Sequence, residues 1–268
     1  MVNIYTLSVF TIREIVHVGS YLFKNLFGAG KVKGLENVPK TGGALLVPNH
    51  VTFIDWIFLS TCLDREVRFL VDSSFYKHPL FGPFLKLAGA MPVTAKGNPQ
   101  EIKKSLKEAG DNLERGELVC IFAEGQLTRT GSLQPFRKGA ERIVKGREVP
   151  ILPVYLDGLW GSIFSFESER FFFKRPKKLP YEVNIYFGAP LSSSTPVSEI
   201  RKAVQRLGVE AAFERKSALK PLHRAFVESC RGRLFKKFIF EAEGRPCSRL
   251  QALTGALALA TPITSGTW

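Results

Sequence analysis

The sequence is short of cysteine, and the few cysteines that it has are far apart. Its 268 residues include Cys62, Cys120, Cys230 and Cys247, and no two of them form a C-x-x-C pattern. This spacing argues against zinc ligands and a disulfide framework, and it is typical of reduced, mostly buried thiols in a chain exposed to the cytosol. We therefore expect no metal site.

Long apolar runs are also missing, even in the aromatic-rich N-terminal stretch at 4–27. That stretch is interrupted by Arg13, Glu14, His17 and Lys24. A spanning helix needs about 20 apolar residues, and no small-residue cleavage site follows a short apolar core. Residues 1–30 instead predict an amphipathic helix lying in the membrane interface, although a first helix packed into the core fits the composition equally well.

Acidic residues are outnumbered, with 24 Asp and Glu against 38 Lys and Arg, so the formal net charge is +14. Such a charge attracts anionic lipid, nucleic acid or an acidic protein. No recognised nucleic-acid motif and no clear recognition helix is present, so we do not expect nucleic-acid binding. Internal repeats and low-complexity tracts are absent too, and 45% hydrophobic residues suffice to bury the core of one catalytic domain.

Strand-like and helix-like segments alternate along the chain. Strands are predicted at 31–35, 44–47, 68–71 and 118–122, helices at 53–62, 81–90, 99–115 and 197–215, and segments at 140–144, 151–156 and 183–187 continue the alternation. This order predicts an α/β domain over residues 31–215, with a largely parallel or mixed central sheet flanked by helices. Residues 221–268 need a separate explanation.

A histidine and an aspartate stand where the predicted strand at 44–47 gives way to a helix. A turn between strand and helix lets Asp55 reach back to one imidazole nitrogen of His50, so that the other nitrogen is free to accept a proton. Asp55 and His50 would thus form the orienting half of a triad without its serine. The alternative is that Asp55 completes a helix cap with Thr52 and that His50 is a loop histidine.

A second polar turn follows the predicted strand at 118–122. It presents backbone N–H groups, a threonine hydroxyl and the Arg129 guanidinium, all of which suit a phosphate. Glu124 is placed to hold Arg129 or a substrate hydroxyl, and Arg137 and Lys138 add positive charge nearby. A solvated loop is the competing interpretation.

Taken together, the two turns resemble the glycerolipid acyltransferase family that includes the bacterial 1-acylglycerol-3-phosphate acyltransferases. The family's N-H-x-[ST]-x-x-D motif is matched by Asn49, His50, Thr52 and Asp55. Its F-x-E-G-x-[ST]-R motif is matched by Phe122, Glu124, Gly125, Thr128 and Arg129. The family's second block resembles residues 77–82 and 87–90, and the fourth resembles residues 149–154, which include Pro153.

The resemblance implies direct transfer of a fatty acyl chain from acyl carrier protein or CoA to a glycerolipid hydroxyl, with no bound cofactor. His50 would be the general base and Asp55 its orienter. The residues implied in substrate binding are Glu124, Gly125, Thr128, Arg129, Lys96, Arg137 and Lys138, and Pro153 belongs to the fourth block, which implies contact with the acyl chain. No covalent acyl-enzyme is expected, and no G-x-S-x-G nucleophile motif accompanies His50.

The wording of both motifs is closer still to the transferase domain of the bifunctional 2-acylglycerophosphoethanolamine acyltransferase/acyl-acyl-carrier-protein synthetases. Residues 221–268 resemble the start of the AMP-forming ligase that follows in those proteins. Many relatives carry an arginine near the end of the second block, whereas residues 91–96 offer only Lys96. We therefore expect lysophosphatidylethanolamine as the acceptor. The alternatives are a 1-acylglycerol-3-phosphate or glycerol-3-phosphate acyltransferase and an inactive membrane- or carrier-binding fragment.

Residues 170–178 combine three phenylalanines with five basic residues. This composition suits insertion at the head-group level of an anionic membrane, although a buried aromatic cluster fits it as well. An acidic acyl carrier protein is a further candidate for the same positive surface. We expect a peripheral or monotopic protein on the cytoplasmic face of the inner membrane.

Overall fold

The structure is a computed structural model, and it describes residues 30–79, 82–87, 89–94, 98–167, 181–217, 221–230, 234–239 and 246–264. The predicted N-terminal helix, Lys96 and the aromatic-basic segment at 170–178 lie outside these residues. The chain divides into two compact units, Met1–Ala212 and Phe213–Trp268. Each unit is described by itself.

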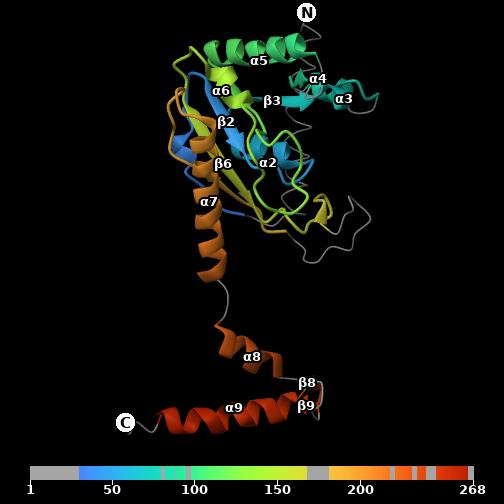
Figure 1. Cartoon of the computed structure of the whole chain (residues 1–268), viewed down its shortest axis with the longest axis vertical. Helices are drawn as coiled ribbons and strands as arrows, with labels where there is room; N and C mark the ends of the chain where they lie inside the picture. The colour runs from blue at the N-terminus through green and yellow to red at the C-terminus, as the bar shows by residue number, and fades with distance from the viewer. Residues whose placement is uncertain are drawn as a thin grey trace, which may run out of the picture. The chain divides into compact units, whose positions relative to one another are not determined.

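A seven-stranded sheet forms the centre of the described part of the first unit (Figure 1). Its strands are β1 (Val32–Lys33), β2 (Ala44–Pro48), β3 (Val67–Asp72), β4 (Met91–Val93), β5 (Leu118–Cys120), β6 (Ile151–Asp157) and β7 (Asn184–Phe187). Their order is β1-β7-β6-β2-β5-β3-β4, and every neighbouring pair is parallel except β6 and β7. The predicted mixed sheet is thus confirmed.

Helices connect and cover these strands. They are the 3₁₀ turn η1 (Leu35–Asn37) and the helices α2 (Asp55–Cys62), α3 (Ser73–Tyr76), α4 (Gly82–Leu87), α5 (Pro99–Glu114), α6 (Gly139–Val144) and α7 (Val197–Ser217). The strand predicted at 31–35 is shorter than expected because Gly34, at φ 70°, turns the chain into η1. The helix predicted from residue 53 begins at Asp55, and its cap residue is Ile54 rather than Thr52.

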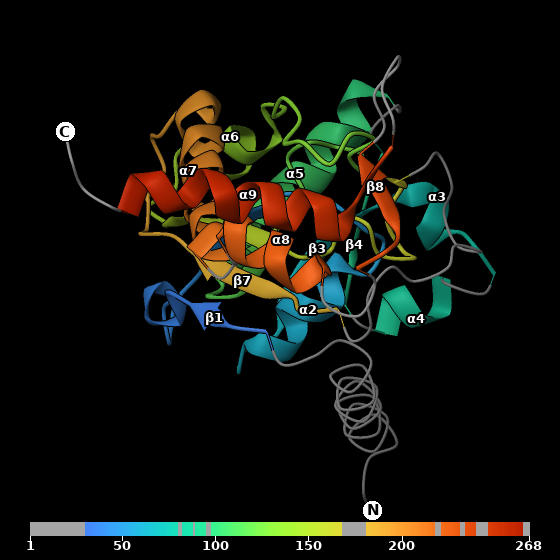
Figure 2. The same cartoon turned by 90° about the horizontal axis from the view of Figure 1, so that it is seen from below.

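Side chains of β2 alternate between the two faces of the sheet, as a strand requires. Leu46 packs into one hydrophobic cluster with Phe58 and Leu59 of α2. Leu45 and Val47 pack into a second cluster, which α5, α6 and α7 cover. Figure 2 accordingly shows α6 and α7 on one side of the sheet and α2 on the other.

The strand order places β2 between β5 on one side and β6 on the other. All three strands run in the same direction, so their carboxyl ends lie at one edge of the sheet. In open α/β sheets, ligands bind outside these ends where the strand order reverses. The loops that follow β2, β5 and β6 are therefore the expected walls of a site.

Beyond the end of α7, the described part of the second unit contains two helices and a short hairpin. These are α8 (Leu222–Cys230), β8 (Lys237–Ile239), β9 (Cys247–Ser248) and α9 (Arg249–Thr264), with β8 and β9 antiparallel. Large apolar side chains are exposed on it, among them Leu222, Phe235 and Leu257.

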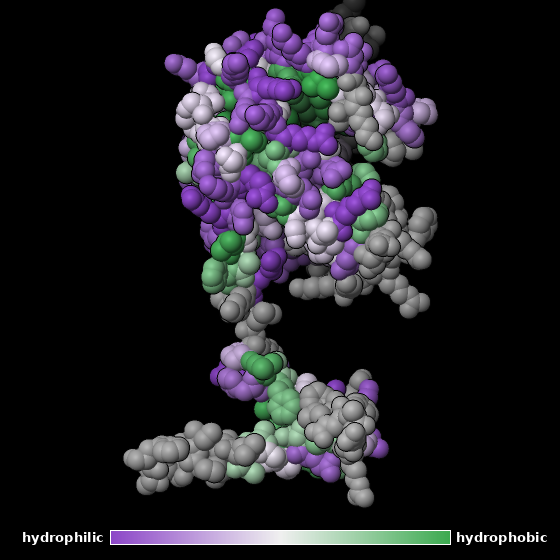
Figure 3. All heavy atoms as spheres, viewed as in Figure 1, coloured by the Kyte–Doolittle hydropathy of each residue, from purple (hydrophilic) through white to green (hydrophobic). Residues whose placement is uncertain are grey.

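Figure 3 shows mainly hydrophilic side chains on the displayed face of the first unit, with smaller hydrophobic patches. Among the described residues, no helix has both the length and the apolar character needed to cross a membrane. All four cysteines are free thiols.

Candidate active site

His50 and Asp55 meet in the turn between β2 and α2. The Nδ1 atom of His50 lies 2.9 Å from Oδ2 of Asp55. The Asp55 side chain is fully buried, whereas 21% of the His50 side chain is exposed. The predicted contact is confirmed, and it leaves Nε2 of a partly accessible imidazole as the nitrogen that can accept a proton.

The Asp55 carboxylate is held by four further hydrogen bonds from the same turn. Oδ2 accepts from the backbone N–H of Val51 at 2.6 Å, and the backbone N–H of Thr52 lies 3.0 Å from both carboxylate oxygens. The Thr52 hydroxyl donates to Oδ1 at 2.5 Å. These donors compensate the burial of the carboxylate and fix its orientation. Thr52 therefore supports Asp55 instead of capping the helix.

Asn49 anchors the start of this turn to β6. Its side-chain N–H donates to the carbonyl oxygen of Leu156 at 3.1 Å, and its amide oxygen accepts from the N–H of Leu156 at 2.7 Å. Asn49 is 5% exposed. From the sequence, Asn49 could be identified only as a motif position. Its contact with Leu156 could not be predicted, because the two residues are 107 positions apart.

Glu124, in the turn after β5, holds the backbone of His50. One carboxylate oxygen accepts from the N–H of His50 at 2.7 Å, and the other accepts from the N–H of Gln134 at 2.7 Å. Of the two partners predicted for Glu124, Arg129 is replaced by these backbone donors, and a substrate hydroxyl stays a prediction. Burial raises the pKa of Glu124, while the two N–H donors and the nearby imidazole oppose that rise.

Thr128 holds His50 from the other side. Its backbone N–H donates to the carbonyl oxygen of His50 at 2.9 Å. Its hydroxyl donates to the carbonyl oxygen of Ser132 at 2.8 Å, and the residue is 2% exposed. Thr128 therefore holds the backbone of His50 in place. Its hydroxyl is bonded within the loop and is not directed outward to a phosphate.

The ring of Phe122 stacks on the imidazole of His50. The two ring centroids are 4.0 Å apart, and the ring planes differ by 22°. This packing helps to fix the orientation of the imidazole ring. This stacking could not be predicted from the sequence, since the two residues are brought together by the pairing of β2 with β5.

Three exposed cations, Arg129, Arg137 and Lys138, stand in the segment between β5 and α6. Gly125 has φ 69°, and a side chain at this position would meet the Arg137 side chain, which packs over it. The Arg129 guanidinium lies over the ring of Phe166, 5.2 Å from its centroid. Lys138 is exposed and precedes α6.

Pro153 takes another position. It lies inside the sheet, where β6 pairs it with Val47 of β2, and its carbonyl oxygen accepts from Gly188 at 2.8 Å. It is therefore a packed residue of the sheet.

Cys120 is also buried, and this burial raises the pKa of its thiol, which makes it a poor nucleophile. Over the described ranges, no group of three or more His, Cys, Asp or Glu side chains is arranged to hold a metal ion.

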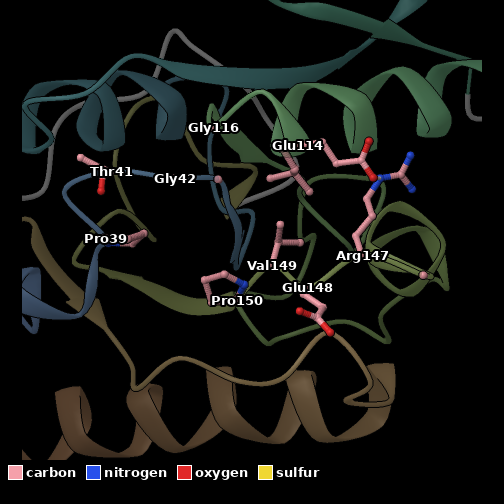
Figure 4. A pocket seen from close by; sticks show the side chains of 12 residues that line it. Pro39, Thr41, Gly42, Glu114, Gly116, Arg147, Glu148, Val149 and Pro150 are labelled. Atoms are coloured by element: carbon pink, nitrogen blue, oxygen red, sulfur yellow. Dashed lines mark ion pairs between the residues drawn. The ribbon is translucent and has the colours of Figure 1, made fainter.

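A pocket lies at the opposite edge of the sheet, where β2 and β6 begin (Figure 4). Its lining residues are Pro39, Thr41, Gly42, Gly43, Leu113, Glu114, Gly116, Gly146, Arg147, Glu148, Val149 and Pro150. The charge of Arg147 is already satisfied there, by Glu114 at 3.1 Å and Asp111 at 2.8 Å. We assign no chemistry to this pocket, because His50 and Asp55 stand at the other edge of the sheet.

Comparison with known proteins finds a match between residues 30–157 and the family model described as Acyltransferase. The "1-acyl-sn-glycerol-3-phosphate acyltransferase BAT2, chloroplastic" of Brassica napus is 30% identical over 139 residues, which are 52% of this chain and 40% of that protein. The "1-acyl-sn-glycerol-3-phosphate acyltransferase" of Pseudomonas aeruginosa is 27% identical over 130 residues, 46% of this chain and 48% of its own. The chain thus spans less than half of either relative.

Among solved structures, the 1-acyl-sn-glycerophosphate acyltransferase PlsC from Thermotoga maritima has a similar fold. The TM-score is 0.61 at 22% sequence identity, and the likeness covers 82% of this chain and 86% of that one. It includes residues beyond the segment matched by the family model.

Proposed function

We propose that this chain is a member of the glycerolipid acyltransferase family and that it transfers a fatty acyl group from a thioester to the free hydroxyl of a lysoglycerophospholipid. The observation that carries the proposal is the contact of 2.9 Å between His50 Nδ1 and Asp55 Oδ2, which directs Nε2 to the substrate. The acyl donor is acyl carrier protein or CoA carrying the acyl chain as a thioester.

His50 acts as general base in this reaction. Its Nε2 takes the proton of the acceptor hydroxyl while the hydroxyl oxygen attacks the thioester carbonyl carbon. Asp55 keeps the proton of Nδ1 in place and stabilises the imidazolium that forms. When the tetrahedral intermediate collapses, the C–S bond breaks and the imidazolium returns its proton to the departing thiolate. An ester and a free thiol result, and no acyl-enzyme is formed.

The acceptor phosphate is held by the exposed cations around the second turn. Arg137 packs over Gly125, whose missing side chain leaves room for it, and Arg129 lies over the ring of Phe166. A guanidinium binds two phosphate oxygens at once, which makes arginine well suited to this role. Lys138 and Lys96 contribute further positive charge. Glu124 and Thr128 act from behind, by holding the backbone of His50.

1-Acylglycerol-3-phosphate is our first candidate for the acceptor, because the curated relatives are named as acyltransferases for this substrate. Lysophosphatidylethanolamine is the second candidate. It is favoured by the segment at 91–96, in which Lys96 is the only basic residue. A phosphodiester head group carries less negative charge than a phosphomonoester and needs fewer cations. We place the reaction at the cytoplasmic membrane surface.

The test is transfer of a labelled acyl chain from acyl carrier protein or CoA to vesicles containing each acceptor in turn. We expect transfer by the native chain and loss of at least about a thousandfold in His50→Ala, because the general base is removed. His223→Ala, at an exposed histidine of α8, is the matched control and should transfer normally. Activity that survives in His50→Ala would refute the mechanism. Lipid binding without turnover by the native chain would favour a non-catalytic binding domain.

The acceptor head group is tested with Arg129→Gln. We expect the KM for 1-acylglycerol-3-phosphate to rise about tenfold with little change in kcat, since a phosphate contact of about 1.4 kcal/mol is lost. Arg142→Gln, at an exposed arginine of α6, serves as the control. Equal KM values for Arg129→Gln and the native chain would remove Arg129 from the phosphate site.

A further inference from the structure

We propose that Arg201 of α7 is a positioning residue that sets the geometry of His50 through the loop after β5. The inference rests on the acyltransfer proposed above. Arg201 lies outside residues 30–157, the segment matched by the family model. Its guanidinium donates from Nε to the carbonyl oxygen of Gln134 at 3.0 Å and from Nη2 to the carbonyl oxygen of Leu133 at 2.9 Å.

A single peptide group connects Arg201 with Glu124. The carbonyl oxygen of Leu133 accepts from Arg201, and the N–H of the same peptide group, at Gln134, donates to Glu124 at 2.7 Å. A cation at the oxygen end of an amide polarises it and strengthens the hydrogen bond at its N–H end. The other oxygen of Glu124 accepts from the N–H of His50 at 2.7 Å. A continuous series of hydrogen bonds therefore runs from α7 to the backbone of the general base.

The helix that carries Arg201 is itself fixed against the sheet. Ile200 and Val204 are completely buried, and Ile200 packs in the same cluster as Leu45 and Val47 of β2. The first backbone N–H of α7, at Val197, donates to the Glu141 carboxylate of α6 at 2.5 Å. Arg201 therefore projects from a helix that is fixed against the sheet. A side chain must be held in this way if it is to position another loop.

The forked shape of arginine matters for this role. Nε and Nη2 lie on one edge of the planar guanidinium and reach two successive carbonyl oxygens together, whereas a lysine ammonium is a single point of charge. Arg201→Lys should therefore restore the charge without restoring the paired geometry. Arg201→Met removes both and keeps much of the apolar stem.

Kinetics distinguish positioning from general stabilisation of the fold. For the folded fraction of Arg201→Met, we expect kcat to fall about tenfold with less than a twofold change in acceptor KM, and Arg201→Lys to recover only part of the loss. Arg206→Met, at an exposed arginine of the same helix, is the matched control and should keep the native kcat. In Glu124→Gln, adding Arg201→Met should change kcat less than twofold, because the connection is already broken.

Hydrogen exchange provides a readout that does not depend on turnover. The amides of His50 and Gln134 should exchange at least about tenfold faster in Arg201→Met than in the native chain or in Arg206→Met. Absence of transfer by the native chain would refute the proposed function, and the exchange rates would still test the positioning. Native exchange at both amides, or a kcat loss that adds fully to that of Glu124→Gln, would overturn the role of Arg201.

Discussion

The two loops that build the site are held in opposite ways. Within the loop after β2, the Asp55 carboxylate takes all its hydrogen bonds from residues no more than five positions away. The loop after β5 is held by His50, 74 residues before Glu124, and by Arg201, 67 residues after Gln134. The Asp55 carboxylate is therefore held by its own turn, whereas the backbone of His50 and the loop after β5 are held by residues far away in the chain.

The largest effect should come from removing the Asp55 carboxylate at the centre of the turn after β2. We expect Asp55→Asn to lower kcat by about 10³- to 10⁴-fold, because an amide no longer fixes the reactive tautomer of His50. Asp64→Asn, at an exposed aspartate, is the control. Steady-state kinetics on the folded variant measure the loss, and a decrease of less than tenfold would mean that Asp55 does not orient the base.

The pattern of residues in this turn made its geometry predictable. A strand, a turn and a helix in sequence placed Asp55 beside His50, and the structure confirms that contact. What the sequence did not reveal was the support behind it. A carboxylate surrounded by the N–H groups of Val51 and Thr52 is a property of the folded turn, and the usual cap pattern suggested a different role for Thr52.

Asn49 joins the turn after β2 to β6, and its removal should be the most destabilising change. Asn49→Ala leaves the buried N–H and C=O of Leu156 without partners, so we expect a loss of about 3 kcal/mol in the free energy of unfolding. Asn98→Ala, which removes the exposed cap of α5, should cost only about 1 kcal/mol. Urea denaturation of both variants gives the comparison. Equal losses would show that the link to β6 carries no special weight.

Thr52→Val should have a smaller effect. The change keeps the shape of the side chain and removes its hydrogen bond of 2.5 Å to Asp55 and the longer one, of 3.3 Å, that it accepts from Ile54 N–H, while the two backbone donors to Asp55 remain. A hydrogen bond to a charged group contributes about 2 kcal/mol, and part of it appears as a several-fold decrease in kcat. Denaturation and kinetics measured together would contradict this expectation if neither quantity changed.

Glu124→Gln should have the smallest effect of these changes, and the effect should appear in how the free energy of unfolding depends on pH. Because burial raises the pKa of Glu124 above its ordinary 4.5, the folded state binds this proton more tightly than the unfolded state. Native stability should therefore fall as pH rises from about 4.5 through the raised pKa, by about 1.4 kcal/mol for each unit of difference.

The glutamine variant has no such proton and should lack that part of the slope. Urea denaturation across this pH window would show the stability of the variant improving relative to the native chain as pH rises. A difference that stayed constant with pH would mean that Glu124 titrates alike in both states.

The sheet was easier to predict than the second loop, for a physical reason. Apolar periodicity fixes which segments are strands, so β2, β3 and β6 were found within a few residues of their bounds. Partners in the loop after β5 follow from the strand order, which brings together segments far apart in the chain. The roles of Gln134 and Arg201 were missed because each acts through or upon main-chain atoms, and main-chain atoms leave no signature in a sequence.

The place of β7 in the sheet sets a limit on how short the folded protein can be made. β7 lies between β1 and β6, and it enters the chain only at Asn184. A polypeptide ending at residue 157 would leave β1 with no neighbour and would turn β6 into an open edge ready to pair with another molecule. The smallest independently expressible piece therefore has to continue through α7, well past the stretch by which relatives are recognised.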